Sequence, residues 1–336
     1  MSDAYAAAGV NIAAATQAKE LMAAAVRSTH GPAVLAGMGA FGGCFDLELA
    51  APGTRPILVA STDGVGTKTL VAAALGRYDT VGQDLVNHCV NDILVQGARP
   101  LFFLDYVAAA TLEVAQVTAI VSGVAAACRA VGCALLGGET AEMPDVYAPG
   151  AFDLAGTIVG VVAREHLLPR PDVMPGDAVL ALPSSGLHTN GYSLARAIVA
   201  QVGYAARPAI LGGASLGETL LAVHRCYLAE VEVLRAAVPL KALAHITGGG
   251  IFDNLPRALP AGLGATIERG SWPIPPICSY LVEQGRLSEH EAFHALNMGL
   301  GMLAVVPADA VAAALAALPE AARVGTISGE PGVRLV

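Results

Sequence analysis

The most informative pattern in this chain is the stretch Leu135-Leu136-Gly137-Gly138-Glu139-Thr140-Ala141-Glu142-Met143-Pro144. An apolar run ends in two glycines, and two carboxylates three residues apart follow directly. The pattern predicts a glycine turn at the end of a strand, with an acid pair on the turn. Such a pair is costly unless a cation neutralises it, and a magnesium ion that carries a nucleotide is the usual candidate.

Two more acidic residues belong to similar patterns upstream. The segment Ser61-Thr62-Asp63-Gly64-Val65-Gly66-Thr67-Lys68 follows an apolar run at 57–60, and Asp92 follows in Val90-Asn91-Asp92-Ile93. Taken singly, each pattern is more often an ordinary polar turn. Together, the acids at these three places in the sequence, Lys68 and the glycine turns favour a phosphate-binding site in the first half of the chain.

Length and composition limit the classes of protein to consider. A chain of 336 residues is long enough for a large buried core, and it predicts two domains. The net charge of −9 argues against a general nucleic-acid binder, which would show a basic face. No apolar run reaches about eighteen residues and no basic region precedes an apolar N-terminal core, so we expect neither a membrane span nor a signal peptide. The six cysteines form no C-x-x-C pair, which favours a reducing cytoplasm.

Hydrophobic periodicity predicts mixed helices and strands. The expected helices cover 13–26, 79–97, 112–131, 216–238 and 308–318, and the expected strands cover 45–49, 57–60, 100–108, 133–136, 154–163, 178–182 and 324–327. Without a strict βαβ rhythm, this order indicates an α+β fold with two mixed α/β domains. The proline-rich stretch 164–177 separates them, so we predict domains at 1–166 and 167–336.

Two familiar nucleotide-binding signatures do not apply. Gly37-Met38-Gly39-Ala40-Phe41-Gly42 matches G-x-G-x-x-G, but that motif must open a helix, and the residues at 45–49 alternate as a strand would. We expect a phosphate-covering loop at 37–43 instead. The turn around Lys68 reads Gly-Thr-Lys and lacks the Walker spacer. Any nucleotide site therefore differs from both the Rossmann and the Walker types.

The second half contains two further turns suited to an anion. Ser184-Ser185-Gly186-Leu187-His188-Thr189-Asn190-Gly191 and Thr247-Gly248-Gly249-Gly250 each combine free backbone N–H groups with a helix start. A tight bend with no ligand explains the glycines equally well. His188 is the preferred candidate among the histidines, since its sequence neighbours are small and polar, although a lone histidine is more often structural.

These motifs, taken together, resemble the phosphoribosylformylglycinamidine cyclo-ligase family, also called AIR synthetase. The resemblance runs over nearly the whole chain and in the family's order. It depends on the segments 63–68, 82–92, 100–106, 137–144, 184–193, 245–257, 271–272 and 297–302. The chain departs from the family pattern at Ala6, Asn11 and His294.

The resemblance implies a function and an architecture. The function is ATP-dependent closure of formylglycinamidine ribonucleotide to aminoimidazole ribonucleotide, with release of ADP and phosphate, in de novo purine biosynthesis. The architecture is a cytoplasmic homodimer whose N-terminal sheets pair across the interface. Residues 1–166 would bind ATP and Mg²⁺ and dimerise, and residues 167–336 would form the substrate side.

The resemblance also implies roles for individual residues. The catalytic residues would be His188, Lys68 and Asp63, and the magnesium ligands would be Asp63, Asp92 and Glu139. The nucleotide would be bound by Gly64, Gly66, Thr67, Lys68, Asn91, Asp92, Gly138, Glu139 and Thr140. The substrate would be bound by Ser185, His188, Asn190, Thr247, Gly248, Gly249 and Gly250.

Other functions are compatible with such an ATP site. An amidotransferase synthetase, a thiamine-phosphate kinase and a selenophosphate synthetase are the close alternatives. The last would require a nucleophile such as Cys44, but no lysine neighbours Cys44 in the sequence to lower the pKa of its thiol. A nucleotide-binding sensor without turnover is an alternative from another class. ATP consumption that depends strictly on the formylglycinamidine substrate would separate these functions.

Overall fold

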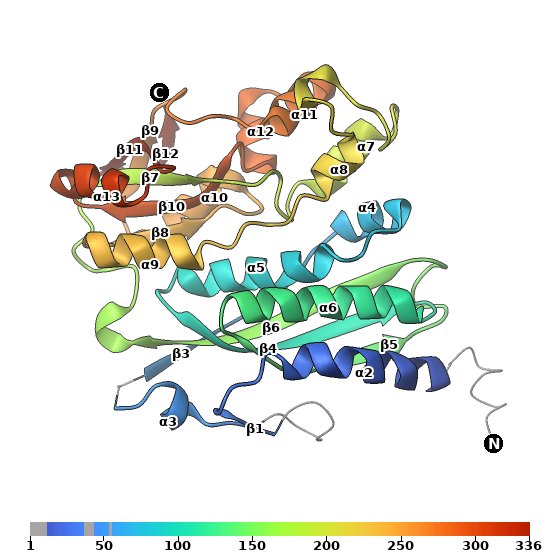
Figure 1. The fold of residues 1–336 in the computed structure, drawn as a ribbon. Helices are drawn as coiled ribbons and strands as arrows, with labels where there is room; N and C mark the ends of the chain where they lie inside the picture. Colours follow the sequence, from blue (N-terminus) through green and yellow to red (C-terminus); the bar gives the residue numbers. More distant parts are fainter. Residues whose placement is uncertain (1–11, 37–43, 54–55) are drawn as a thin grey trace. The chain divides into compact units, whose positions relative to one another are not determined.

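The first of the two larger sheets has four strands in the order β3-β6-β4-β5 (Figure 1). This computed structural model describes residues 12–36, 44–53 and 56–336. Strands β4 and β5 are parallel, and the pairs β3–β6 and β4–β6 are antiparallel. The strands are β3 (Pro56–Gly64), β4 (Arg99–Ala109), β5 (Ala134–Glu142) and β6 (Phe152–Ala163). They belong to a unit formed by residues 1–93 and 99–164.

Helices α5 and α6 cover one face of this sheet (Figure 1). The helices of the unit are α2 (Ile12–Arg27), α3 (Leu47–Ala50), α4 (Lys68–Leu75), α5 (Val81–Leu94) and α6 (Val114–Ala130). Helices α5 and α6 approach closely at Gly82, which has no side chain. A Cβ there would lie only 2.1 Å from the Ile120 carbonyl oxygen. Val81, Leu85, Cys89 and Ile93 are spaced by helical turns along α5 and form its buried apolar stripe.

Strand register decides which side chains share a face. Asp63, Gly156, Asp105 and Gly138 are aligned in one row across the sheet. This row faces the helices, because a Cβ at Gly156 would lie 3.0 Å from Leu85 of α5. The next row contains Gly64, Ala155, Tyr106 and Glu139. It points to the opposite face, because successive side chains of a strand alternate.

The pair Gly137-Gly138 does not form a turn. Strand β5 continues through Gly137, Gly138 and Glu139, and it stays paired with β4 as far as Glu142. A Cβ at Gly138 would lie 2.2 Å from Asp105 Oδ1 on β4. The prediction of a turn was therefore wrong, because this glycine makes room for a buried carboxyl group on the neighbouring strand.

The predicted strand at 45–49 is also wrong. A two-residue strand, β2 (Cys44–Phe45), pairs with β1 (Val34–Ala36), and the helix α3 follows. Asp46 starts this helix because its side chain accepts a hydrogen bond from the Leu49 N–H. The rejected G-x-G-x-x-G motif at 37–43 lies outside the described residues. Its rejection assumed a strand, yet a helix of four residues is still not the long helix of a dinucleotide site.

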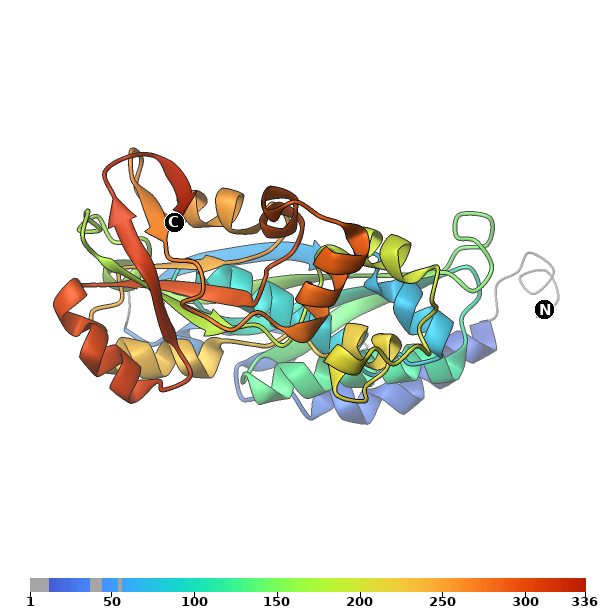
Figure 2. The same cartoon turned by 90° about the horizontal axis from the view of Figure 1, so that it is seen from above.

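The second unit, residues 94–98 and 165–336, contains a six-stranded sheet in the order β12-β9-β11-β7-β10-β8. Strands β12 and β9 are parallel, and the other neighbours are antiparallel. The strands are β7 (Ala178–Pro183), β8 (Ala242–His245), β9 (Gly264–Ile267), β10 (Leu300–Val306), β11 (Ala322–Ser328) and β12 (Gly332–Leu335). The dark red β12 lies at one edge, next to the C-terminus (Figure 2).

The predicted long helix at 216–238 is two helices in the structure. The helices of this unit are α7 (Tyr192–Val199), α8 (Leu216–Leu220), α9 (Leu228–Ala237), α10 (Gly250–Arg257), α11 (Pro276–Gly285), α12 (Glu289–Ala295) and α13 (Val311–Ala317). Ser215 and Glu218 form a capping box at the start of α8. The chain then leaves the helix, and the Tyr227 hydroxyl donates to the Pro183 carbonyl oxygen on β7. These tertiary contacts override the local helical pattern.

The remaining predicted elements are found with shifted ends, and both units mix helices with strands, as expected. The structural boundary falls between Arg164 and Glu165. The roles assigned to the two predicted domains stay predictions. Among the described helices, none is both long and apolar enough to cross a membrane.

Candidate functional site

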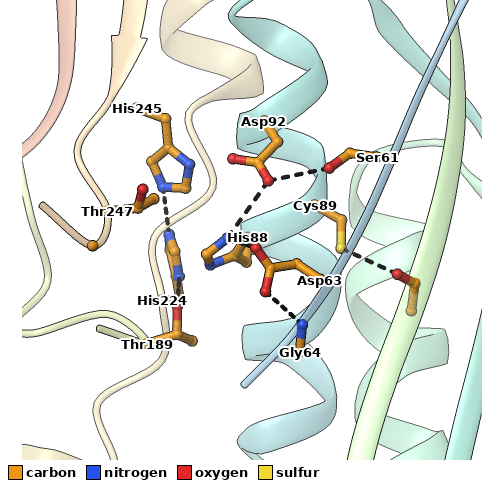
Figure 3. A network of polar contacts seen from close by, with 12 residues as sticks. Ser61, Asp63, Gly64, His88, Cys89, Asp92, Thr189, His224, His245 and Thr247 are labelled. Atoms are coloured by element: carbon orange, nitrogen blue, oxygen red, sulfur yellow. Dashed lines mark hydrogen bonds and ion pairs between the residues drawn. The ribbon is translucent and has the colours of Figure 1, made fainter. Parts of the chain in front are cut away.

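In the first unit, two of the predicted magnesium ligands meet at one histidine (Figure 3). Asp63 lies near the end of β3, and Asp92 lies on α5, one turn after His88. The His88 Nε2 atom is 2.8 Å from Asp63 Oδ2 and 3.5 Å from Asp92 Oδ2. Ser61 Oγ also donates to Asp92 Oδ2 at 3.2 Å. The structure thus brings both carboxylates to one point.

His88 received no role from the sequence. Burial by itself lowers the pKa of its imidazole. The hydrogen bond with Asp63 and the charges of Asp92, Asp63 and Asp84 outweigh burial, and the pKa lies above its ordinary value. The spacing of His88 and Asp92, four residues apart on a helix, is the sequence signal that could have identified the pair.

The two carboxylates fit what Mg²⁺ takes from a protein. Their side chains are 46% and 26% exposed, so each retains access to solvent. Mg²⁺ usually keeps several waters and binds one or two carboxylates together with phosphate oxygens. Asp63 and Asp92 could therefore hold the ion.

Glu139, the third predicted ligand, lies elsewhere in the unit. Strands β6 and β4 separate its strand, β5, from β3. Three strand spacings place the backbones of Glu139 and Asp63 about 14 Å apart. Their side chains also point to opposite faces of the sheet. The structure therefore does not bring Glu139 to the ion site of Asp63 and Asp92, and Gly138 and Thr140 lie on β5 with it.

Lys68, the predicted phosphate ligand, is fully buried in the structure. Its Nζ atom lies 2.7 Å from Asp84 Oδ2 on α5, and both side chains are 0% exposed. Burial lowers the pKa of Lys68, and the Asp84 carboxylate opposes that effect. The ammonium group neutralises a buried carboxylate, a role that the sequence did not predict.

The other predicted nucleotide-binding residues of this unit flank Lys68 and Asp92. Gly64 ends β3, and its N–H donates to Asp63 Oδ1 at 2.6 Å. Thr67 is the N-cap residue of α4, and the Gly66 carbonyl oxygen accepts a hydrogen bond from the Thr69 hydroxyl. Asn91 is buried on α5 beside Asp92. The end of β3 and the start of α4 thus form one continuous backbone turn next to the two carboxylates.

In the second unit, the turn at 184–191 contains three of the predicted substrate-binding residues. The backbone N–H of Ser185 donates to His188 Nε2 at 3.2 Å, and the Ser185 hydroxyl donates to the Val223 carbonyl oxygen. His188 is buried and has a positive φ of 62°. Asn190 lies on the same turn, and its N–H donates to the Leu187 carbonyl oxygen. Asn297, which the sequence assigned no role, donates to the Gly186 carbonyl oxygen.

The second turn, Thr247 to Gly250, is organised by Asn254. The Asn254 amide donates to the carbonyl oxygens of Thr247, Gly248 and Gly250 at 2.7–3.3 Å. Gly250 begins α10 with a φ of 60°, and a Cβ there would lie 1.7 Å from the Phe293 carbonyl oxygen. Only glycine fits this position. Gly249 is the N-cap residue and also has a positive φ.

Sequence reasoning missed two histidines that lie beside His188. The rings of His188 and His224 are stacked with their centroids 4.0 Å apart and an angle of 15° between them. His224 Nε2 lies 3.1 Å from His245 Nε2 (Figure 3). All three rings are buried. The sequence neighbours of His188 give no sign of this cluster, because His224 comes from the break between α8 and α9.

Two domain models of one known family match most of the chain. The N-terminal domain model of the AIR synthase related proteins matches residues 46–162. The C-terminal domain model of the same family matches residues 174–336. The two models thus meet in the proline-rich segment between the two units.

Curated relatives cover the chain from end to end. A phosphoribosylformylglycinamidine cyclo-ligase of Geobacillus kaustophilus is 48% identical over 332 residues, which are 98% of this chain and 96% of the relative. One from Alkaliphilus oremlandii is 45% identical, over 97% of this chain and 96% of the relative.

Solved structures with a similar fold are more distant in sequence. Thiamine-monophosphate kinase from Stenotrophomonas maltophilia has a TM-score of 0.67 at 19% identity, over 94% of this chain and 95% of that one. A hydrogenase maturation protein HypE in complex with ATP has a TM-score of 0.61 at 19% identity, over 90% and 83% of the two chains. At this identity the likeness shows the fold alone.

Proposed function

Because the chain belongs to the AIR synthase related family, we propose that it closes the imidazole ring of aminoimidazole ribonucleotide from formylglycinamidine ribonucleotide and ATP. The observation that carries this function is its 45–48% identity, over nearly its full length, to relatives that are named cyclo-ligases. The thiamine-monophosphate kinase, an enzyme of another activity with a similar fold, is only 19% identical.

The reaction has a simple chemical requirement. A formamide carbonyl is a poor electrophile, and its oxygen is a poor leaving group. Transfer of the γ-phosphoryl group of ATP to that oxygen releases ADP and corrects both defects. The ribosyl-bearing nitrogen then forms the C–N bond, the C–O bond breaks with release of phosphate, and the nitrogen loses a proton. Catalysis of this kind depends on positioning and on stabilisation of charge.

We assign the nucleotide to the first unit. Asp63 and Asp92 would hold Mg²⁺, which supplies positive charge to the phosphate oxygens. The turn from Gly64 to Thr67 would place backbone N–H groups at those oxygens. Lys68 would support this turn through its ion pair with Asp84, because its ammonium group is buried against that carboxylate.

We assign the phosphorylated substrate to the second unit. Ser185, His188 and Asn190 lie on one turn, and the residues from Thr247 to Gly250 lie on another. Asn297 and Asn254 hold the two backbones in place through hydrogen bonds to carbonyl oxygens, and each turn leads into the start of a helix, which favours an anion. His188 would orient or deprotonate the reacting group.

We further propose a cytoplasmic homodimer that forms through the sheet face opposite α5 and α6. This face presents Leu58 and Leu104, which are 55% and 38% exposed. A hollow of about 370 Å³ on the unit is lined by Phe45, Leu47, Leu58, Leu101, Phe102, Leu104 and Leu136. Glu139 points to the same face, so a magnesium role for it would require a second ion or a residue from the other subunit.

The decisive test is whether ATP consumption depends on the substrate. The purified protein should release ADP and phosphate only when formylglycinamidine ribonucleotide is present, and aminoimidazole ribonucleotide should form in equal amount. ATP hydrolysis without this dependence, or nucleotide binding without turnover, would contradict the function and favour a kinase or a sensor.

Variants test the nucleotide assignment and the substrate assignment separately. Asp63→Asn and Asp92→Asn should fold normally, lose most of the turnover and weaken Mg²⁺-dependent binding of an ATP analogue. Glu139→Gln tests the distant carboxylate in the same way.

His188→Ala should reduce turnover about 100-fold or more while the analogue still binds. Calorimetric titration with the analogue, alongside steady-state kinetics, measures both quantities. If His188→Ala abolishes nucleotide binding, the assignment to two units fails.

A further inference from the structure

His224 connects the two turns that we assign to the substrate. Its Nδ1 atom lies 3.3 Å from Thr189 Oγ1, next to His188 on the first turn. Its Nε2 atom lies 3.1 Å from Nε2 of His245, the last residue of β8, which leads into the second turn. Figure 3 shows His224 between Thr189 and His245. One fully buried ring thus contacts both turns.

On the basis of the proposed ring closure, we propose that His224 is a positioning residue: it fixes the orientation of the His188 ring and the protonated nitrogen of His245. His224 would not touch the substrate itself. It would act through the stack on His188 and through the hydrogen bond to His245.

The hydrogen bond couples the protons of two rings. A bond between two Nε2 atoms contains one hydrogen, so one imidazole donates and the other accepts. The donor and the acceptor are therefore fixed as different tautomers. If both rings were doubly protonated, two N–H groups would point at each other and the bond would break. While this hydrogen bond is kept, the imidazoles of His224 and His245 can together take up at most one proton beyond those of their neutral forms.

The stack on His224 restricts the His188 ring from one side. On another side, Gly301 of β10 has no side chain, which allows Tyr227 and His188 to pack close to the strand. A Cβ at Gly301 would lie 1.7 Å from the Tyr227 hydroxyl oxygen and 3.1 Å from His188 Cε1. The Tyr227 hydroxyl is held by the Pro183 carbonyl oxygen, and its ring lies 6.1 Å from that of His188. The His188 ring therefore has little freedom to turn, as a group that must meet a reacting atom requires.

The same geometry argues against a metal ion shared by the three histidines. An imidazole binds a metal in the plane of its ring, at about 2 Å from the nitrogen. The rings of His188 and His224 are stacked with their centroids 4.0 Å apart, and their planes are inclined by only 15°. No point lies in both planes at that distance from a nitrogen of each ring.

Two substitutions at His224 separate hydrogen bonding from packing. His224→Phe keeps a stacked ring and loses both hydrogen bonds, whereas His224→Gln keeps an amide at the Nε2 position and loses the ring. We expect kcat to fall roughly ten- to hundredfold in His224→Phe and less in His224→Gln, with the KM for ATP unchanged. A ring that merely fills space would give the opposite order. Wild-type kcat in His224→Phe would overturn the proposal.

His290→Phe is the matched control. His290 also stacks on a histidine, His294, with ring centroids 5.8 Å apart, and it lies exposed on α12. We expect wild-type kcat from this variant. A fall in kcat as large as that of His224→Phe would show that loss of any stacked histidine is harmful, and would overturn the specific role of His224.

A spectroscopic measurement on the wild-type protein tests the shared hydrogen directly. In ¹⁵N spectra of the imidazole groups, one Nε2 of His224 and His245 should carry a hydrogen and the other should be bare. Two protonated or two bare Nε2 atoms would overturn the proposal. So would stoichiometric binding of Co²⁺ that His224→Gln abolishes. If the protein shows no substrate-dependent ATP consumption, the proposed function fails, and these spectra still decide the state of the pair.

Discussion

At the scale of single residues, burial changes what a charged side chain does. Lys68 has the sequence context of a phosphate ligand, yet its ammonium group neutralises Asp84 where neither side chain touches solvent. Removing one partner of a buried ion pair leaves an uncompensated charge, whereas replacing both partners by apolar residues avoids this cost. Loss of ATP binding in a Lys68 variant would therefore be accompanied by loss of stability.

Lys68→Met should lower the free energy of unfolding by about 3–5 kcal/mol. The double variant Lys68→Met/Asp84→Leu should recover a large part of this loss, because no buried charge is left. Urea unfolding measures both. The exposed pair of Arg77 and Asp79, 3.7 Å apart, is the control, and Arg77→Met should cost less than about 1 kcal/mol. Equal effects of Lys68→Met and Arg77→Met would contradict the buried pair.

Asp105 gives a prediction on pH. Burial raises the pKa of its carboxyl group to about 7. In the unfolded chain the pKa is about 3.9, so the folded protein binds the proton more tightly and loses stability as pH rises from about 4 to 7. Asp105→Asn should remove this loss, which amounts to roughly 4 kcal/mol at most.

The test compares the unfolding free energies of wild type and Asp105→Asn between pH 5 and 8. The free energy of unfolding of Asp105→Asn should rise relative to that of the wild type as pH rises. The difference between the two free energies should level off above pH 8. Exposed Asp309 provides the control, because Asp309→Asn should follow the wild-type curve. A difference that does not change with pH would show that Asp105 is charged throughout this range.

At the scale of elements, glycines and caps decide where helices begin and end. The second substrate turn depends on Gly250, whose φ and whose distance from the Phe293 carbonyl exclude a side chain. The break between α8 and α9 depends on the Ser215 cap and on the contacts of Tyr227, and it places His224 beside His188. Local pattern alone predicts one continuous helix there.

Gly250→Ala should lower the free energy of unfolding by about 2–4 kcal/mol, because backbone strain and a collision with the Phe293 carbonyl add together. Substrate turnover should fall with it. Gly262→Ala is the matched control: Gly262 has a φ of 88° and no atom within 4 Å of the added Cβ, so it should lose only about 1–2 kcal/mol and keep its activity. Equal losses in stability and activity would mean that the collision does not matter.

At the scale of the whole molecule, the proposed homodimer would bury the apolar sheet face of the first unit, on which Leu58 and Leu104 are exposed. Leu58→Asp and Leu104→Asp should convert the proposed dimer to a monomer, since a charge on each side of a paired sheet is strongly unfavourable. Sedimentation velocity measures the change. Val202→Asp, at an exposed position of the second unit, should leave the mass unchanged. A wild-type protein that sediments as a monomer would refute the dimer.

The sequence by itself determined the main helices and strands of the first unit, the two mixed units and the family. Each of these depends on short-range patterns: periodicity, proline and glycine positions, and long motifs such as Gly137–Pro144. The stripe of α5 shows this well, because residues spaced by helical turns share a face whatever the rest of the chain does.

Only the tertiary structure decided which polar groups meet. Glu139 and Asp63 have similar contexts in sequence, but strand order and alternation put them at opposite edges and on opposite faces of one sheet. Lys68 meets Asp84, and His224 meets His188 and His245, through contacts between residues far apart in the chain. Such contacts arise from strand order, register and helix breaks, which no local pattern encodes.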